Sequence, residues 1–312
     1  MRDVLRDPIS GQPMERSGDV LIGTASYPIR NGIPRFGGPT ASVESFGDEW
    51  NAFNYDDFRA NWIEHCIQPT FGSLDVFRGK VVVDAGAGSG MHSRWIAEAG
   101  AKQVYALELS HSVDDVMQRN LAARDNVDII QCSIDAPPLA EGIADIVYCY
   151  NVIQHTPSVE RTARALFKLV KPGGELMFSC YRWGEGPAYR LRRVCYDFLR
   201  ANLSTWSPAA LMRYSRIVAW LRLIPVLGFT LEAGAFVIRG TVPSSHTLRQ
   251  RLKQAALNTY DFYGSHSYQH FLTKDELTTL LYSLQPDRAK VLNVDKVFND
   301  PAAKAAAFRV FK

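Results

Sequence analysis

The chain has 312 residues, of which 46% are hydrophobic and 21% charged, the balance of a soluble globular protein rather than a disordered or fibrous one. The N-terminus is charged and lacks the apolar core of a signal peptide, and no run of about 18 uncharged apolar residues occurs, so we expect neither a secretory leader nor a spanning helix. Five cysteines without a C-x-x-C pair indicate reduced thiols in a cytoplasmic protein rather than a disulfide framework.

The net charge of +3 is unevenly distributed along the chain. Between residues 181 and 260 there are twelve basic and three acidic residues, so a basic segment is joined to a slightly acidic remainder. A basic segment suggests an anionic partner or surface, and a solvated helical face explains it equally well.

Two segments precede the regular part of the chain. Residues 1–40 are rich in Gly and Pro and carry short apolar runs, which predicts small strands and tight turns. Residues 41–78 carry aromatic side chains at loose helical spacing, Phe46 and Trp62 among them, and predict one or two helices with an aromatic face. Such a face is more often core packing than a ligand site.

Between residues 80 and 180 the sequence predicts strands that alternate with helices. This alternation is typical of an α/β fold with a parallel, Rossmann-like sheet and helices on both faces. We expect Ser110 or Ser112 to cap the second helix, and KPGG at 171–174 to end the third helix and turn the chain. The predicted strands are 79–86, 103–109, 126–132, 144–152 and 175–181, and the predicted helices are 91–100, 112–123 and 157–170.

A helical insertion at 181–260 interrupts the alternation, which then resumes and completes a seven-stranded, mostly parallel sheet. An insertion at this point would lie above the carboxyl edge of the sheet, where open α/β folds bind ligands. The predicted elements are helices at 188–203 and 208–229 in the insertion, followed by a helix at 273–284 and strands at 289–297 and 306–312.

The stretch VVVDAGAGSG at 81–90 places three glycines between a strand and a helix. Glycines let the backbone approach a ligand, and amides at the start of the helix point toward it. Met91 and His92 follow Gly90, so the G-K-[ST] of a Walker phosphate loop is absent. The G-x-G-x-G spacing also departs from the G-x-G-x-x-G of dinucleotide sites, which weakens an NAD interpretation.

Five segments in order, VVVDAGAGSG, ALELS, QCSIDAPPL, ADIVYCYNVIQHT and LVKPGGELMFS, resemble the motifs of class I S-adenosylmethionine-dependent methyltransferases. The resemblance covers roughly residues 80–180. It implies an S-adenosylmethionine-binding core at 79–180, helices at 41–78 that cover the cofactor site, a lid at 181–260, and the C-terminal part of the sheet at 261–312.

The resemblance also assigns cofactor-binding residues at the ends of four strands. Glu108 stands where the family holds the ribose hydroxyls, and Ser133 stands where many relatives have Asp beside the adenine. A turn-capping Asp84 and a solvated Glu108 are the structural alternatives. The implied cofactor-binding residues are Asp84, Gly86, Ala87, Gly88, Glu108, Leu109, Ser133, Ile134 and Asn151.

Methyl transfer from an activated donor depends on positioning, and a general base is needed only where the acceptor must lose a proton. His155, at the exit of the fourth strand, is the best-placed candidate base, and a histidine hydrogen-bonded beneath a lid is the alternative. Tyr263, His266 and His270 crowd the stretch 261–273, which is expected to be a loop and a substrate-binding candidate. Aromatic packing is the alternative there. No metal site is expected.

The segments DPISGQPM and YPIRNGIPRF resemble a small zinc-ribbon domain that activates some tRNA and release-factor methyltransferases. Asp7 and Ser10 stand at the first two cysteine places of that domain, and no cysteine occurs before Cys66. Carboxylate and hydroxyl groups do not replace a thiolate zinc site. We therefore expect residues 1–40 to be a metal-free, β-rich segment that packs on the catalytic domain.

The insertion contains IVAWLRLIPVLGF beside Arg213, Arg216 and Arg222. A buried lid or a dimer helix is favoured over a helix that lies on a membrane, and the arginines suit an anionic acceptor. The sequence thus predicts an S-adenosylmethionine-dependent methyltransferase that modifies oxygen or nitrogen of a small molecule or biosynthetic intermediate. The alternatives are an RNA or protein methyltransferase, a catalytically silent cofactor-binding scaffold and, most distantly, an NAD-dependent oxidoreductase. Nucleic acid is not favoured as a partner.

Overall fold

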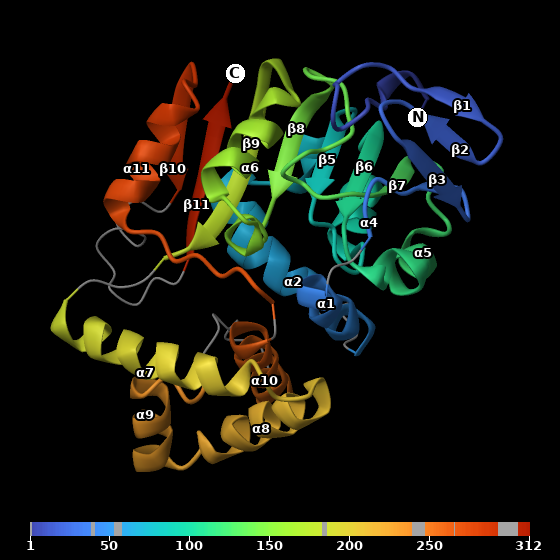
Figure 1. Cartoon of the computed structure of the whole chain (residues 1–312). Helices are drawn as coiled ribbons and strands as arrows, with labels where there is room; N and C mark the ends of the chain where they lie inside the picture. Colours follow the sequence, from blue (N-terminus) through green and yellow to red (C-terminus); the bar gives the residue numbers. More distant parts are fainter. Residues whose placement is uncertain are drawn as a thin grey trace. The chain divides into compact units, whose positions relative to one another are not determined.

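In a computed structural model of the chain, the described residues fall into two units (Figure 1). The first comprises residues 1–183 and 268–312 and contains both sheets, and the second, here called the helical unit, comprises residues 184–267. The structure describes residues 2–38, 41–52, 58–182, 186–238, 247–264, 266–292 and 305–312.

Seven strands form the main sheet in the order β10, β11, β9, β8, β5, β6, β7. The five strands from β9 to β7 are parallel, and β11 is antiparallel to β9 and β10. The predicted seven-stranded, mostly parallel Rossmann-like sheet is confirmed, although residues 293–297 of one predicted strand lie outside the described residues. The strands are β5 (Val81–Ala85), β6 (Gln103–Glu108), β7 (Val127–Gln131), β8 (Ala144–Cys149), β9 (Val170–Tyr181), β10 (Arg288–Leu292) and β11 (Ala305–Phe311).

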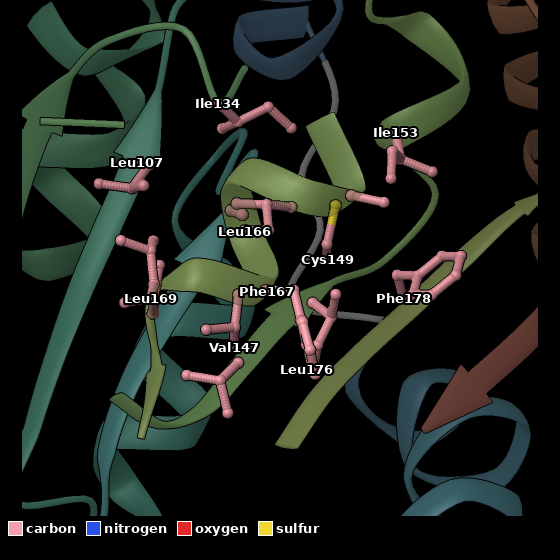
Figure 2. Packing of buried hydrophobic residues seen from close by; sticks show 14 of the residues in the cluster. Leu107, Ile134, Val147, Cys149, Ile153, Leu166, Phe167, Leu169, Leu176 and Phe178 are labelled. Carbon is pink, nitrogen blue, oxygen red and sulfur yellow. The ribbon is translucent and has the colours of Figure 1, made fainter. Parts of the chain in front are cut away.

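Alternate residues of each strand belong to hydrophobic clusters on opposite faces of the sheet. On β5, Val82 packs with Trp62 and α4 (Met91–Glu98), whereas Val83 belongs to the cluster that contains α6 (Val159–Lys168) and α11 (Lys274–Ser283). Figure 2 shows the second cluster, with side chains of α6 against those of the strands. The predicted helices on both faces are therefore confirmed.

Two local predictions hold only in part. The helix expected at 112–123 is divided into a 3-10 turn, η5 (His111–Asp114), and α5 (Val116–Leu121). Ser110 stands at the N-cap position of η5 but makes no side-chain capping bond, because its hydroxyl lies 2.9 Å from that of Ser112, which donates to the carbonyl of Gly88 at 2.8 Å. The KPGG segment follows the end of α6 and is assigned to β9, but its four residues lie between the pairs Val170–Ala144 and Glu175–Ile146, so the chain makes a local excursion there.

The segment before the main sheet folds into four antiparallel strands followed by short helices. The small sheet continues onto the edge of the main one through a bridge between Arg35 and Gln131, and the amide of Phe36 donates to the Gln131 carbonyl at 2.8 Å. Its elements are η1 (Arg2–Val4), β1 (Glu15–Ser17), β2 (Val20–Ile22), β3 (Ser26–Arg30) and β4 (Ile33–Pro34), and the helices are α1 (Ala41–Ala52), α2 (Arg59–Trp62), the π-helix η3 (Ile63–Ile67), α3 (Gln68–Phe71) and η4 (Leu74–Phe77).

Asp7, at a cysteine place of the zinc-ribbon resemblance, organises the N-terminal sheet as a buried carboxylate. It accepts hydrogen bonds from the amides of Ile9 (2.8 Å) and Thr24 and from the hydroxyl of Tyr27 (3.3 Å). Burial raises the pKa of Asp7, but the amide donors outweigh it and hold that pKa well below its usual range. A charged side chain thus ties together two loops of this sheet.

The helical unit contains four helices among its described residues: α7 (Pro187–Leu203), α8 (Pro208–Leu221), α9 (Pro225–Ala233) and α10 (Leu248–Tyr263). The helix predicted at 208–229 is interrupted before Pro225, which begins α9. The loop predicted at 261–273 begins only at Gly264, because α10 continues through Tyr263, which is fully buried and bonded to the Ala235 carbonyl, and ends at the C-cap Gly264. None of the described helices is long and apolar enough to cross a bilayer.

We predict that Asp7→Ala loosens the N-terminal sheet, because it removes the buried acceptor shared by the amides of Ile9 and Thr24 and the hydroxyl of Tyr27, at a cost of roughly 1–3 kcal/mol. Since the folded pKa of Asp7 is depressed, its contribution is complete above the ordinary pKa of 3.8 and is lost as the pH falls below it. At pH 7, peptides within residues 2–35 should be less protected from hydrogen exchange in Asp7→Ala than in the native chain, and the protection factor of the native chain, corrected for the intrinsic exchange rate, should be lower at pH 3 than at pH 7. The exposed Asp19→Asn is the control, and equal protection in all three samples at pH 7 would contradict the assignment.

Candidate active site

The glycine turn between β5 and α4 uses its backbone amides within the protein. Gly86 and Ala87 donate to the carbonyl of Leu107 at 2.8 and 2.9 Å, and Gly88 donates to the Glu108 carboxylate at 2.7 Å. All three glycines have positive φ, and Gly90 is the left-handed N-cap of α4. A phosphate-binding loop presents such amides to its ligand. Here they are directed at the end of β6, and residues 84–93 contain no lysine or arginine.

Glu108 ends β6 and is 7% exposed. One carboxylate oxygen accepts the Gly88 amide, and the other accepts the amides of Leu109 and Ser110 at 2.9 and 2.8 Å. An ionised carboxylate has about four acceptor positions, so it can also take hydroxyl donors from a ligand. Glu108 is therefore a structural clamp as well as a candidate for the ribose of a nucleoside.

Asp84 is buried beneath the turn and accepts a hydrogen bond from the Ser93 hydroxyl at 2.6 Å. Burial raises the pKa of Asp84 to about 7, with a further increase from the charge of Glu108, while the Ser93 hydrogen bond opposes the change. A cation bound nearby would favour the ionised form. The sequence had not singled out Ser93, although its position in the first turn of α4, nine residues after Asp84, faces the strand.

The residues assigned to the adenine side follow β6 and β7. Ile134 is buried, and Leu109 is half-buried with its side chain near Gly37. The Ser133 hydroxyl donates to the carboxylate of Asp135, which is also paired with Arg161. Ser133 is thus oriented by a neighbouring acid, a contact that the sequence did not indicate.

A buried side-chain network connects the N-terminal sheet to the backbone beside Glu108. The Arg35 guanidinium donates to Gln131 at 3.0 Å and to Asp114 at 2.6 Å. The Gln131 amide in turn donates to the carbonyls of Leu109 and Ser110 at 3.1 and 3.3 Å. Glu108 holds the amides of these two residues and Gln131 holds their carbonyls, so the loop is fixed from both sides. Both residues lie in motifs that the sequence analysis quotes, YPIRNGIPRF and QCSIDAPPL, but neither motif indicated this contact.

Asn151 follows β8 in a left-handed conformation with a φ of 57°. Its amide donates to the Ser179 hydroxyl at 2.8 Å, and that hydroxyl donates back to the Asn151 side-chain oxygen at 3.0 Å. Asparagine tolerates this conformation better than most residues. Close by in sequence, Gln154 is fully buried, and neither its amide oxygen nor its amide nitrogen has a hydrogen-bond partner among the described residues.

His155 lies in η6 (Ile153–His155), beyond the carboxyl end of β8. Its Nδ1 lies 3.1 Å from the carbonyl oxygen of Tyr268, and its ring makes edge contacts with Phe46 and Tyr181 at 5.0 and 5.5 Å between centroids. Since a carbonyl only accepts hydrogen bonds, Nδ1 carries the proton, and the neutral ring has its lone pair on Nε2. This tautomer is the one that a base acting through Nε2 requires.

The structure brings His270 to His155 but places the other two substrate candidates in the helical unit. His270 donates its amide to the Gln154 carbonyl at 2.9 Å, and its Nε2 lies 3.0 Å from the Thr156 carbonyl. Tyr263 is fully buried and donates its hydroxyl to the Ala235 carbonyl at 2.5 Å. His266 is 5% exposed, and its carbonyl accepts from Arg200 at 2.8 Å. The substrate roles of Tyr263 and His266 stay predictions.

His92 begins α4 within a cluster of aromatic rings. It stacks on Trp62 at 5.1 Å between centroids and contacts Tyr148 and Tyr150 edge-on. Removal from water lowers the pKa of His92 to about 4, so the imidazole is neutral at pH 7. A neutral, stacked ring contributes packing at the start of the helix rather than proton transfer.

These groups define the chemistry available at the carboxyl edge of the sheet. Glu108 supplies acceptors for hydroxyl groups, Asp84 supplies a carboxyl group whose ionised form a bound cation would favour, and the neutral tautomer of His155 has a lone pair on Nε2. The turn offers no cationic side chain and few amides to a phosphate. The residues therefore suit a cationic nucleoside better than a dinucleotide.

We predict that Asp84 makes the ligand-free protein less stable as the pH rises. Because its folded pKa of about 7 exceeds the ordinary 3.8, the folded state keeps a proton that the unfolded state loses, so the free energy of unfolding falls between about pH 4 and pH 7 by at most about 4 kcal/mol. Urea unfolding at pH 5 and pH 8 should show this decline in the native chain and a smaller one in Asp84→Asn. An equal decline in Asp84→Asn would contradict the assignment, and the exposed Asp125→Asn is the matched control.

Residues 83–178 match the family described as a methyltransferase domain. An O-methyltransferase of ubiquinone biosynthesis from Pseudomonas fluorescens (strain Pf-5) is 33% identical over 170 residues, which are 53% of this chain and 68% of that protein. The protein of the same name from Coxiella burnetii (strain RSA 331) is 31% identical over 160 residues, or 48% and 67% of the two chains.

A solved structure of an O-methyltransferase family protein from Burkholderia thailandensis aligns with 84% of this chain and 59% of that one, at 12% identity and a TM-score of 0.46. The family match and the two relatives agree with the glycine turn, the Glu108 clamp and the strand order. The chain belongs to the class I S-adenosylmethionine-dependent methyltransferases.

Proposed function

We propose that this methyltransferase transfers the methyl group of S-adenosylmethionine to a hydroxyl group of a small biosynthetic intermediate, with His155 as the general base. The observation that carries the proposal is the hydrogen bond of His155 Nδ1 to the Tyr268 carbonyl, which leaves Nε2 as an acceptor. The relatives named as O-methyltransferases of ubiquinone biosynthesis support oxygen as the acceptor atom.

For the cofactor, the residues at the glycine turn fit a sulfonium nucleoside without phosphates. Glu108 would hold the ribose hydroxyls, and Asp84 beneath the turn would favour the positive charge of the methionine part. Gly86, Ala87 and Gly88 would let the backbone approach it, and Leu109, Ser133, Ile134 and Asn151 would complete the site. The bound cofactor supplies an activated methyl group, and displacement leaves the electron pair of the broken bond on sulfur.

For the acceptor, a hydroxyl must lose its proton as the new carbon–oxygen bond forms. The lone pair of His155 Nε2 takes that proton, and the Tyr268 carbonyl then stabilises the resulting imidazolium through Nδ1. His270 would line the same region, because it is bonded to the backbone on both sides of His155. Arg182, buried at the end of β9, is a further group that suits an acceptor with negative charge.

Gln154 supports an acceptor site near His155. A fully buried side-chain amide without hydrogen-bond partners lowers the free energy of unfolding by roughly 1–3 kcal/mol. The stability of the fold therefore does not explain a glutamine at this position. A hydroxyl or carbonyl of the acceptor would satisfy it. Tyr263 and His266 stay candidates for binding the acceptor, although Tyr263 is part of the core of the helical unit.

We predict that Glu108→Gln weakens binding of S-adenosylhomocysteine by about 10- to 100-fold, because an amide cannot accept all three backbone hydrogen bonds and retains fewer acceptor positions for ribose. Isothermal titration calorimetry measures the change. Glu160→Gln, an exposed carboxylate on α6, is the matched control. Unchanged affinity in Glu108→Gln, or binding of NAD in preference to both sulfur nucleosides by the native chain, would remove this site assignment.

We predict that His155→Asn lowers kcat by about 100-fold or more while affinity for S-adenosylhomocysteine stays unchanged. Asparagine keeps a donor for the Tyr268 carbonyl and removes the Nε2 lone pair. If the role of His155 were purely structural, this substitution would therefore lower kcat much less. The measurement is turnover of a set of phenols of decreasing hydroxyl pKa, and the deficit should shrink for the more acidic phenols. His65→Asn, a half-buried histidine of η3, is the control. A deficit that is independent of acceptor acidity would contradict a general base.

A further inference from the structure

The helical unit carries large apolar side chains on its surface along the end of α8 and the start of α9. Their relative exposures lie between 43% and 79%, values rare for a run of large apolar residues within so short a stretch of a soluble domain. These side chains, together called the apolar surface, are Ile217, Trp220, Leu223, Ile224, Val226 and Phe229.

Two arginines share the outward face of α8 with this surface. Arg213, Arg216, Ile217 and Trp220 follow one another at helical spacing and are all exposed, whereas Leu211, Ser215 and Val218 on the opposite face are buried. Neither Arg213 nor Arg216 forms an ion pair with any described residue. Arg222, by contrast, pairs with Glu232 at 2.5 Å, and Glu232 is the only acidic residue between 208 and 238.

The exposure of these side chains does not fit the buried lid that the sequence favoured. We propose that the apolar surface, with Arg213 and Arg216, binds the interface of a membrane that contains anionic lipids. A helix with a tryptophan and aliphatic residues on the same face as unpaired arginines inserts its apolar side chains among the acyl chains, while the cations contact the lipid phosphates. The elements are too short to span a bilayer, so the contact is peripheral. This inference does not rest on the proposed acceptor.

A second copy of the chain fits this surface less well. A two-fold interface brings the same patch of both copies together, and here each patch presents two arginines with no unpaired acid among the described residues beside them. Nucleic acid is also a poor partner, because Ile217, Val226 and Phe229 would be dehydrated against a polar surface. Anionic lipid satisfies the charges and the apolar groups together.

The test uses the full chain without methyl donor, in co-sedimentation with vesicles of phosphatidylcholine alone or mixed with phosphatidylglycerol. Binding should require the anionic lipid and weaken with salt. The double variant Arg213→Gln/Arg216→Gln should bind the anionic vesicles about 30-fold more weakly, at about fivefold for each charge removed. Val226→Asp should bind at least about tenfold more weakly, because it places a charge among the acyl chains.

Tyr282→Asp on α11 is the matched control, since Tyr282 and Val226 are both 79% exposed. Its binding should equal that of the native chain, and circular dichroism checks that all variants fold. Absence of binding to anionic vesicles overturns the proposal, as does equal weakening by Tyr282→Asp. A concentration-dependent dimer that Val226→Asp dissociates, without vesicle binding, assigns the surface to a second copy instead. Binding of S-adenosylhomocysteine, measured by calorimetry, tests the methyltransferase assignment independently of the vesicle results.

Discussion

The buried carboxylate of Glu108 joins two loops that are twenty residues apart in sequence. It accepts an amide from the glycine turn and two amides from the loop after β6, and charged hydrogen bonds of this kind are among the strongest in a folded protein. The same contact consumes amides that a phosphate would need. One acidic side chain therefore closes the turn, fixes the neighbouring loop and makes the site unsuited to a pyrophosphate, and the other polar contacts of this edge are arranged around it.

Groups that are costly in the free protein gather at the carboxyl edge of the sheet. Burial raises the pKa of Asp84 to about 7, the buried side-chain amide of Gln154 has no hydrogen-bond partner among the described residues, and Asn151 occupies a conformation with positive φ. Each departs from what stability alone favours, and such departures concentrate at binding and catalytic sites because a ligand restores the missing interaction. The packing of the N-terminal sheet and of the two hydrophobic clusters stabilises the fold and offsets the unfavourable free energy of these groups.

Sequence periodicity was sufficient for the sheet and for the glycine turn, because alternation and glycine spacing are local signals. It was insufficient wherever a distant partner decided the outcome. Ser112 looked like a helix cap, but its hydroxyl is directed to the Gly88 carbonyl, 24 residues away. Tyr263 looked like a loop residue, but it is the last residue of α10, where its buried hydroxyl bonds the carbonyl of Ala235, 28 residues away. Arg35 and Gln131 belong to two motifs far apart in the sequence, and their contact with each other arises only when the small sheet meets β7.

The bridge between Arg35 and Gln131 has a consequence for assembly. β7 is the last strand of the main sheet, and an open strand edge is a template for unwanted pairing with other chains. Here the covering segment is part of the same polypeptide, so its effective concentration at that edge is set by a tether and does not fall when the protein is dilute. Protection of the edge, and support of the loop beside Glu108, are thus independent of expression level and need no separate subunit.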